Sequence, residues 1–365
     1  MLFQNVFKRY DKWIFGCTML MLAMGLLLVS STGFCIEQSH HWGSFMFLKK
    51  HIIFLILGVF VCFLCSVSKQ HLRLGWIILI IGVVLMLLTY FFGVTIKGAK
   101  RWINVGGLSI QPAEIMKLGM VMVWSNLLSN RKYAFAGLLF IISAVLLLTQ
   151  PDFGSLLLLS CVILVLLFAN GIQFRFISLI CLLFMLMLGS GYLLFPHVQK
   201  RVHTFLQNEQ AGKDEKYNKR YQINKATQSF KTAGLFGKGP GSGKLKYQLP
   251  DAHADFVFTV VGEEFGILGC IVLVVLLSCF LTRIFVHLKH TAHIEQQLLI
   301  IGLSSLILIQ SWFHMLSNLN LMPTKGFAMP LLGYGGTGLV TTLACIGFLL
   351  NITQNNSNHK IFDKF

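Results

Sequence analysis

Apolar stretches of transmembrane length follow one another along this chain, separated mostly by short polar segments. A helix needs about 20 apolar residues to cross the hydrocarbon core of a bilayer. Ten stretches approach or exceed this length and lie near residues 14–36, 51–67, 74–93, 112–129, 134–150, 153–170, 174–195, 255–283, 296–318 and 331–352. We therefore predict an all-α polytopic membrane protein of about ten transmembrane helices, of which 112–129 and 153–170 are short enough to merge or tilt.

One polar segment is much longer than the others. Residues 196–254 separate the seventh predicted helix from the eighth. This segment contains several glycines, which permit tight turns but do not have the spacing of a phosphate-binding loop. Because the sequence has no internal repeat, we expect a single domain over 1–365 with one large loop between helices 7 and 8.

The basic residues of the short loops predict the orientation, because cytoplasmic loops are enriched in Lys and Arg. Twelve basic residues fall on the side of the two termini and six on the opposite side. We therefore expect 1–13 and 353–365 to be cytoplasmic and 196–254 to be extracytoplasmic. The long loop carries further basic residues, which the rule does not explain since long loops count little toward it.

Composition excludes a soluble protein and a nucleic-acid-binding protein. The chain is 55% hydrophobic and 12% charged, and a soluble protein of this length could not cover so much apolar surface. Its net charge of +17 has no soluble basic domain to carry it, so lipid head groups or phosphates are the expected anionic partners. All nine cysteines lie in or beside apolar stretches, where we expect inert small hydrophobes rather than disulfides.

A single carboxylate, Asp255, stands where the long loop meets the eighth predicted helix. A charge at that boundary costs free energy unless something uses it. Asp255 could cap the helix that starts at Phe256, or it could act as a general base at the membrane surface. His253 lies two residues before it.

A second polar group surrounds the start of the predicted helix 112–129. Pro112 suits a first helical turn, where the helix dipole favours the negative charge of Glu114. Glu114 and Lys117 are three residues apart, so an ion pair is expected that is either structural or functional. Upstream, Arg101 beside Trp102 is either an anchor at the membrane interface or part of a site.

Further polar residues lie at helix ends or inside apolar stretches. Asp152, two residues before a glycine, is more typical of a helix cap than of a catalytic group. Adjacent Glu263 and Glu264 must face different directions, so at least one should meet a polar partner inside the bundle. His314 within an apolar stretch is more often a packing residue than a ligand.

The last loop, around Tyr334, is rich in Pro and Gly. We expect an irregular or re-entrant loop whose N–H groups need partners from protein or water. Such groups can bind an anion, although a purely structural turn is equally compatible with the sequence.

Six motifs together resemble the SEDS family (shape, elongation, division and sporulation), and its division members more than its elongation members. In order they are GAKRWI, QPAEIMK, QPDFG, PDAHADFVF, GEEFG and PTKG followed by YGG. The resemblance covers essentially the whole chain. Departures include Ala254 in place of threonine, Ala113 in place of serine and His314 in place of asparagine.

The resemblance implies a peptidoglycan glycosyltransferase of the bacterial inner membrane that polymerises lipid II during cell division. In this interpretation Asp255 is the catalytic residue and takes the proton from the acceptor sugar's 4-hydroxyl. Basic residues would bind the pyrophosphate of the leaving group, and a wider set would support the site. The basic residues are Arg101, Lys117, Arg201 and Lys325, and the supporting residues are Trp102, Glu114, Asp152, His253, Glu263, Glu264 and Tyr334.

The resemblance also implies substrates and partners. The substrates are lipid II and undecaprenyl-pyrophosphate-linked glycan, and the partners are a class B penicillin-binding protein and other membrane proteins of division. A divalent cation, Mg or Mn, could assist, although the sequence contains no recognisable metal site. Two alternatives remain: a lipid II flippase with a polar path lined by Glu114, Lys117, Glu263 and His314, and a non-catalytic division scaffold.

Overall fold

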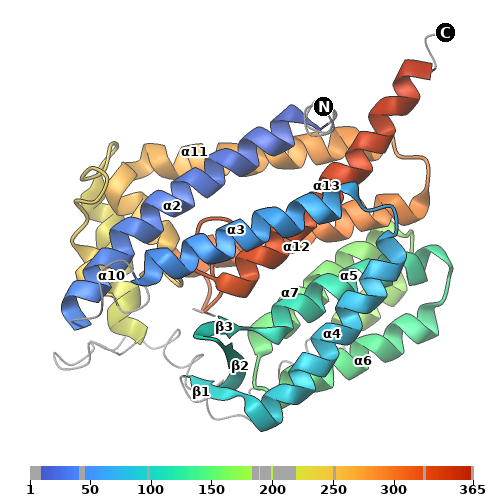
Figure 1. The fold of residues 1–365 in the computed structure, drawn as a ribbon, viewed down its shortest axis with the longest axis horizontal. Coiled ribbons are helices and arrows are strands. Elements are labelled where there is room, and N and C mark those ends of the chain that lie inside the picture. The colour runs from blue at the N-terminus through green and yellow to red at the C-terminus, as the bar shows by residue number, and fades with distance from the viewer. Residues whose placement is uncertain are drawn as a thin grey trace.

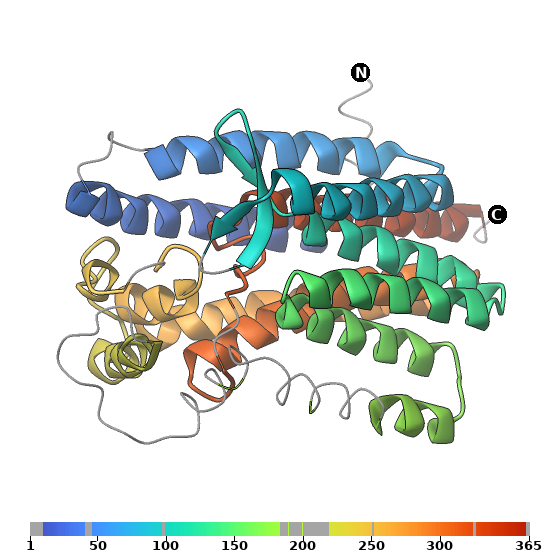
Figure 2. The same cartoon turned by 90° about the horizontal axis from the view of Figure 1, so that it is seen from below.

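The protein is a bundle of long helices with a small β-sheet toward one end (Figures 1 and 2). The computed structural model describes residues 10–40, 46–96, 99–182, 189, 199, 219–249, 252–323 and 326–362. The helices are α2 (Lys12–His40), α3 (Met46–Val67), α4 (His71–Phe92), α5 (Pro112–Ser129), α6 (Tyr133–Thr149), α7 (Phe153–Ala169), α10 (Lys219–Ala233), the short η1 (Leu245–Tyr247), α11 (Val257–Lys289), α12 (Ile294–Asn318) and α13 (Gly336–Phe362). The strands are β1 (Val94–Ile96), β2 (Ala99–Val105) and β3 (Leu108–Ile110).

The predicted membrane-spanning character is confirmed. Among the described residues, α2, α3, α4, α11, α12 and α13 each contain a stretch long and apolar enough to cross a membrane, and α6 and α7 are shorter apolar helices. Helix α5 matches the predicted span 112–129 in its bounds and contains two buried charges. The seventh predicted span, 174–195, lies partly outside the described residues, so the count of ten stays a prediction.

Large apolar side chains cover the outside of the bundle. Phe60 on α3, Ile80 on α4, Ile141 on α6 and Val275 on α11 are all more than half exposed. Such an apolar surface is costly in water and is the surface that lipid chains would cover.

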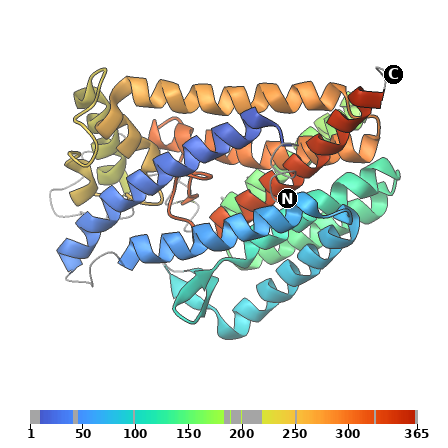
Figure 3. The ribbon, with the colours of Figure 1, turned by 45° about the horizontal axis from the view of Figure 1, so that its top comes forward.

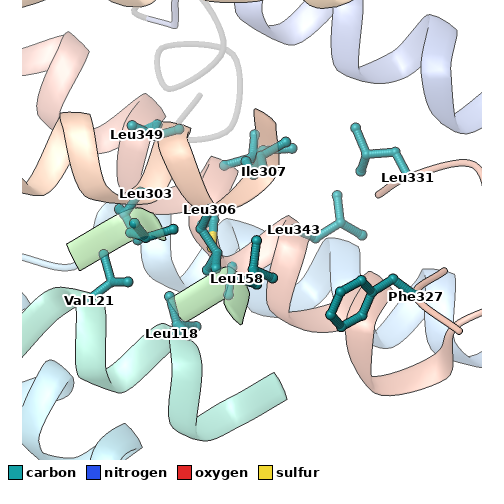
Figure 4. Close-up of a cluster of buried hydrophobic side chains, with 14 of the residues drawn as sticks. Leu118, Val121, Leu158, Leu303, Leu306, Ile307, Phe327, Leu331, Leu343 and Leu349 are labelled. Atoms are coloured by element: carbon teal, nitrogen blue, oxygen red, sulfur yellow. The ribbon is translucent and has the colours of Figure 1, made fainter. Parts of the chain in front are cut away.

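The core lies between α5, α7, α12 and α13. Figure 4 shows leucines of these helices and Phe327 of the loop before α13 packed together. Helix α4 lies close along α5, because Gly82 and Gly119 leave room for the facing backbone. A Cβ on Gly82 would come within 2.6 Å of Met116, and one on Gly119 within 2.4 Å of Leu79. Small residues at helix contacts are typical of membrane bundles.

A three-stranded antiparallel sheet, in the order β1-β2-β3, precedes α5. The apolar pattern of the sequence predicts no strands here. Strands β2 and β3 are joined by Gly106 and Gly107, whose φ angles of +57° and +81° suit a two-residue hairpin turn. The sheet carries Arg101 and Trp102 on β2 and leads the chain into α5.

Helix α11 is broken at Gly266, which has φ 70° and ψ −165°. The glycine-rich segment 234–239 lies against the break and satisfies the backbone groups that the break leaves without helical partners (Figure 3). The four bonds are Ile267 N to Gly234 O (3.1 Å), Leu268 N to Leu235 O (3.1 Å), Lys238 N to Glu263 O (2.9 Å) and Gly239 N to Glu264 O (3.0 Å). The segment is thereby fixed to the first turns of α11, where irregular backbone near a membrane needs such partners.

Candidate active site

Asp255 lies just before α11 and is partly buried. Its carboxylate lies against Gly326, because a Cβ built on that glycine would be 3.6 Å from Asp255 Oδ2 and 3.7 Å from Oδ1. Gly326 also has a φ of +70°, a conformation that favours glycine. Gly326 therefore forms one wall beside the carboxylate.

The capping interpretation of Asp255 is wrong, because the residue at the N-cap of α11 is Phe256. The first N–H groups of the helix find partners on α12 instead. Phe258 N–H donates to His314 Nε2 (3.4 Å), and Thr259 N–H donates to Asn318 Oδ1 (3.1 Å). Asp255 thus occupies the boundary position without serving as the cap.

An aromatic group lies beside this boundary. The His253 ring is 4.8 Å from the ring of Phe47 and 5.2 Å from that of Tyr334, and the last two are 5.4 Å apart. Tyr334 N–H donates to His253 O (2.8 Å), and burial raises the pKa of the Tyr334 hydroxyl. The structure therefore brings together three predicted site residues, His253, Asp255 and Tyr334.

The predicted ion pair between Glu114 and Lys117 is confirmed. Lys117 Nζ lies 2.8 Å from Glu114 Oε1, and the lysine side chain is 0% exposed. The same ammonium lies 5.5 Å from the centroid of the Phe327 ring. Because Phe327 directly follows Gly326, the pair supports the segment that lies against Asp255.

Arg101 and Asp152 form a brace between β2 and the start of α7. Arg101 Nη1 lies 3.7 Å from Asp152 Oδ1, and its other nitrogens donate to the carbonyls of Gln150 and Pro151. The cap interpretation of Asp152 is confirmed, since its carboxylate accepts from Ser155 N–H (3.2 Å) and Ser155 Oγ (2.8 Å). A role of Arg101 in binding pyrophosphate stays a prediction.

Glu263 and Glu264 both have the polar partners that the sequence analysis required of at least one. Glu263 accepts from Lys238 Nζ (2.7 Å) and from Lys244 N–H (2.9 Å). Glu264 lies 3.0 Å from Lys246 Nζ and accepts from Ser31 Oγ (2.7 Å). These bonds tie residues 238–246 to α11 and, through Ser31, to α2.

Some predicted residues lie elsewhere or outside the described chain. Trp102 is half-buried on β2. Arg201 and Lys325 lie outside the described residues. Two buried polar residues of the structure, Asn318 and Lys246, were not predicted. Asn318 follows an apolar stretch, which could have indicated that it needs a partner, whereas Lys246 lies in a polar, glycine-rich segment that gives no such signal.

The described residues contain no group of three or more His, Cys, Asp or Glu side chains that could hold a metal ion. A protein-only cage of that size for the expected divalent cation is therefore not present in this part of the chain. Mg²⁺ is often held by one or two carboxylates together with substrate phosphates. Asp255 is a carboxylate that such an arrangement could use.

Comparisons with known proteins agree with this architecture. The family model of the FtsW, RodA and SpoVE cell cycle proteins matches residues 11–358. The chain is 29% identical to a probable peptidoglycan glycosyltransferase FtsW from Legionella pneumophila, over 95% of this chain and 91% of that protein. It is 31% identical to a protein of the same description from Marinomonas mediterranea, over 96% and 90% of the two chains.

Two solved structures have the same fold. A chain of a peptidoglycan synthase complex, described for its coordination of polymerization and crosslinking, superposes with a TM-score of 0.79 at 24% identity, covering 95% of this chain and 98% of that one. The rod shape determining protein RodA from Thermus thermophilus superposes with a TM-score of 0.69 at 25% identity, covering 95% and 97%.

Proposed function

This chain belongs to the FtsW, RodA and SpoVE family of cell cycle proteins, the SEDS family that its motifs resemble, and we propose that Asp255 is the general base with which it polymerises lipid II. It is a multi-pass membrane protein and a peptidoglycan glycosyltransferase of the FtsW kind. One observation carries the assignment of the base: Asp255 is partly buried just before α11, and its carboxylate lies against Gly326.

The proposed reaction is a displacement at the donor sugar. Asp255 accepts the proton of the acceptor's 4-hydroxyl while that oxygen attacks the anomeric carbon of the donor. The bond from this carbon to the pyrophosphate breaks, and the lipid pyrophosphate leaves with the bonding electron pair. The new glycosidic bond has the opposite configuration to the α-linked donor. A general base of this kind must lie within hydrogen-bond reach of the proton.

The negative charge on the leaving group needs cations. Lys117 is fully buried and already paired with Glu114, and Arg101 is 17% exposed with its donors directed at two carbonyls and Asp152. We therefore assign Lys117 and Arg101 to supporting the site. Arg201 and Lys325, which lie outside the described residues, keep the direct pyrophosphate contacts that the family resemblance implies. Placing cations where charge develops stabilises the transition state.

The cellular setting belongs to the proposal too. We infer that the protein acts in the inner membrane with both termini in the cytoplasm, and that it works with a class B penicillin-binding protein. The similar chain in a synthase complex that polymerises and crosslinks peptidoglycan supports such a partner, because crosslinking is a transpeptidase reaction. Other division proteins are expected as further partners.

The flippase alternative requires a polar path through the bundle. The four residues that would line it have close partners within the protein. Glu114 pairs with Lys117, Glu263 bonds the 238–244 segment, and His314 bonds the backbone of Phe327. These contacts are those of packed structural networks, so we favour glycosyl transfer.

The test is synthesis of glycan from lipid II by the purified protein, with and without its transpeptidase partner. Asp255→Asn should lower the rate by at least about 100-fold without changing thermal stability, in the range expected for loss of a general base. Glu295→Gln is the matched control, because Glu295 lies at the other end of α12, about 35 Å from Asn318 along the helix. It should polymerise normally.

Two outcomes would contradict the proposal. Normal polymerisation by folded Asp255→Asn protein would remove Asp255 as the base. Lipid II transport by the same variant in reconstituted vesicles, without polymerisation by the unmodified protein, would favour the flippase.

A further inference from the structure

Helix α12 carries three buried amide or imidazole side chains on one face. Gln310, His314 and Asn318 are four residues apart, so they lie one above the other along the helix. We call them the polar ladder. Each donates a hydrogen bond to a main-chain carbonyl of another segment: Gln310 Nε2 to Ala328 O (3.0 Å), His314 Nδ1 to Phe327 O (2.7 Å) and Asn318 Nδ2 to Asp255 O (3.0 Å).

Two members of the ladder also accept bonds from the start of α11. His314 Nε2 accepts from Phe258 N–H, and Asn318 Oδ1 accepts from both the N–H and the hydroxyl of Thr259 (3.1 and 2.8 Å). The imidazole must therefore be neutral with its proton on Nδ1, because a doubly protonated ring has no acceptor. Each side chain thus joins two segments that meet at Asp255.

We propose that His314 and Asn318 are positioning residues for the glycosyl transfer proposed above, on which this inference rests. Asn318 fixes the peptide between Asp255 and Phe256, and His314 fixes the peptide between Phe327 and Ala328, one residue beyond Gly326. One bond holds the backbone of Asp255, and the other holds the backbone next to Gly326. The two bonds thus hold both segments whose contact places the Asp255 carboxylate against Gly326. Their common support is α12, a helix of 25 residues.

The polar ladder holds the Asp255 carboxylate at the distance from the acceptor hydroxyl that a general base needs. A carboxylate must lie within hydrogen-bond reach of the hydroxyl that it deprotonates, and a misplacement of about 1 Å can cost on the order of 100-fold in rate. A site held by a helix keeps its geometry better than one held by a loop alone. Here Asp255 and Gly326 are both on irregular backbone, and α12 holds the two segments in a fixed position relative to each other.

The chemistry of the two side chains predicts which substitutions are tolerated. An asparagine offers one amide donor and one carbonyl acceptor, as a neutral histidine does. His314→Asn should therefore keep the donor to Phe327 O, whereas His314→Ala removes both bonds. Asn318→Asp keeps the acceptor for Thr259 but replaces the donor to Asp255 O with an oxygen.

The experiment measures lipid II polymerisation at several substrate concentrations for the purified full chain, with its class B penicillin-binding protein present throughout. Thermal unfolding identifies the folded variants. For His314→Ala, Asn318→Ala and Asn318→Asp we expect kcat to fall about 10- to 100-fold while KM for lipid II stays within about twofold. His314→Asn should stay within about threefold of the unmodified protein.

Ser311→Ala is the matched control. Ser311 is fully buried on the same helix and donates to Ile307 O (2.8 Å) within it, so its loss should leave kcat unchanged. A purely structural ladder predicts less folded protein with an unchanged rate per folded molecule.

Three results would overturn the inference. They are an unchanged kcat in folded Asn318→Asp protein, an unchanged kcat in folded His314→Ala protein, and a folded His314→Asn variant as slow as His314→Ala. Where an alanine variant does not fold, Asn318→Asp and His314→Asn decide the question, because the first keeps the size of the side chain and the second keeps a polar donor. If Asp255→Asn itself polymerises normally, the proposed function fails, which these results distinguish from failure of the ladder alone.

Discussion

Removing one charge of the Glu114–Lys117 pair should destabilise the protein more than removing both. The two charged atoms are 2.8 Å apart, and the lysine side chain is 0% exposed. At an effective dielectric constant of about 20, their attraction is about 6 kcal/mol. That attraction is opposed by a desolvation cost of several kcal/mol per ion, so the pair as a whole contributes little net stability.

A single substitution loses the attraction and leaves the desolvation cost of the remaining ion. Breaking a buried pair in this way costs about 3–5 kcal/mol. Glu114→Gln should be the worse variant, because it leaves the fully buried Lys117 alone, whereas Glu114 is 10% exposed in its side chain and reaches some solvent. The double variant Glu114→Gln/Lys117→Met should recover most of the loss.

The assay is thermal unfolding of the detergent-purified protein. At roughly 2 °C per kcal/mol, Lys117→Met should lower Tm by about 6–10 °C and Glu114→Gln by more. Because unfolding of such proteins is often irreversible, the order of the variants at one scan rate is the quantity to compare. Lys132→Met, which removes an exposed lysine from a loop, is the control and should change Tm by less than about 1 °C.

Two results would refute this reasoning. One is a shift below about 2 °C in both single variants, and the other is a double variant as unstable as the sum of the singles. Polymerisation by the double variant adds a separate readout. A rate that recovers with stability assigns the pair to supporting Phe327, whereas a stable but inactive double variant would mean that Lys117 acts on the substrate directly.

Two further predictions concern other parts of the molecule. Gly266→Ala should give little folded protein in a detergent-solubility assay, because Gly266 has a φ of +70° and a Cβ there would lie 2.3 Å from Leu235 O; a normal yield would show that the break can relax. At the start of α2, burial raises the pKa of Asp11, but bonds from His287 and Arg283 outweigh it and lower the pKa overall. The stabilisation by these bonds is therefore complete above about pH 4, the pKa of an aspartate in the unfolded chain, and is lost as the pH falls below it. The Tm difference between the unmodified protein and Asp11→Asn should shrink from pH 6 to pH 3, and a constant difference would contradict this.

The helices were predictable because apolar length is a local property of the sequence. The predicted span 112–129 matches α5, and 153–170 matches α7 within one residue. Helix α3 starts at Met46, before the predicted residue 51, because the flanking Lys49 and Lys50 can extend along the helix toward a polar boundary. The sheet was missed because strands of three to seven residues beside a span give no comparable signal.

The site was predictable only where its contacts are local. The spacing of three residues predicted the Glu114–Lys117 pair, and the position of Asp152 predicted its cap. The brace from Arg101 to Asp152 joins residues far apart in the chain, so no sequence pattern gave it. Asn318 was missed because nothing local links it to Asp255, although the two are bonded in the fold.

Two of the motifs, QPAEIMK and QPDFG, meet at Phe327, which directly follows a third, PTKG, and this meeting gives them a supporting role. Its ring lies beside Lys117 and packs against Gly154, where a Cβ would come within 2.9 Å, while its carbonyl accepts from His314. Phe327 directly follows Gly326, the residue against the Asp255 carboxylate. Because several distant motifs converge on the wall beside one carboxylate, their charges need not contact the substrate to matter. Substitutions in them should change the placement of Asp255 before they change its chemistry.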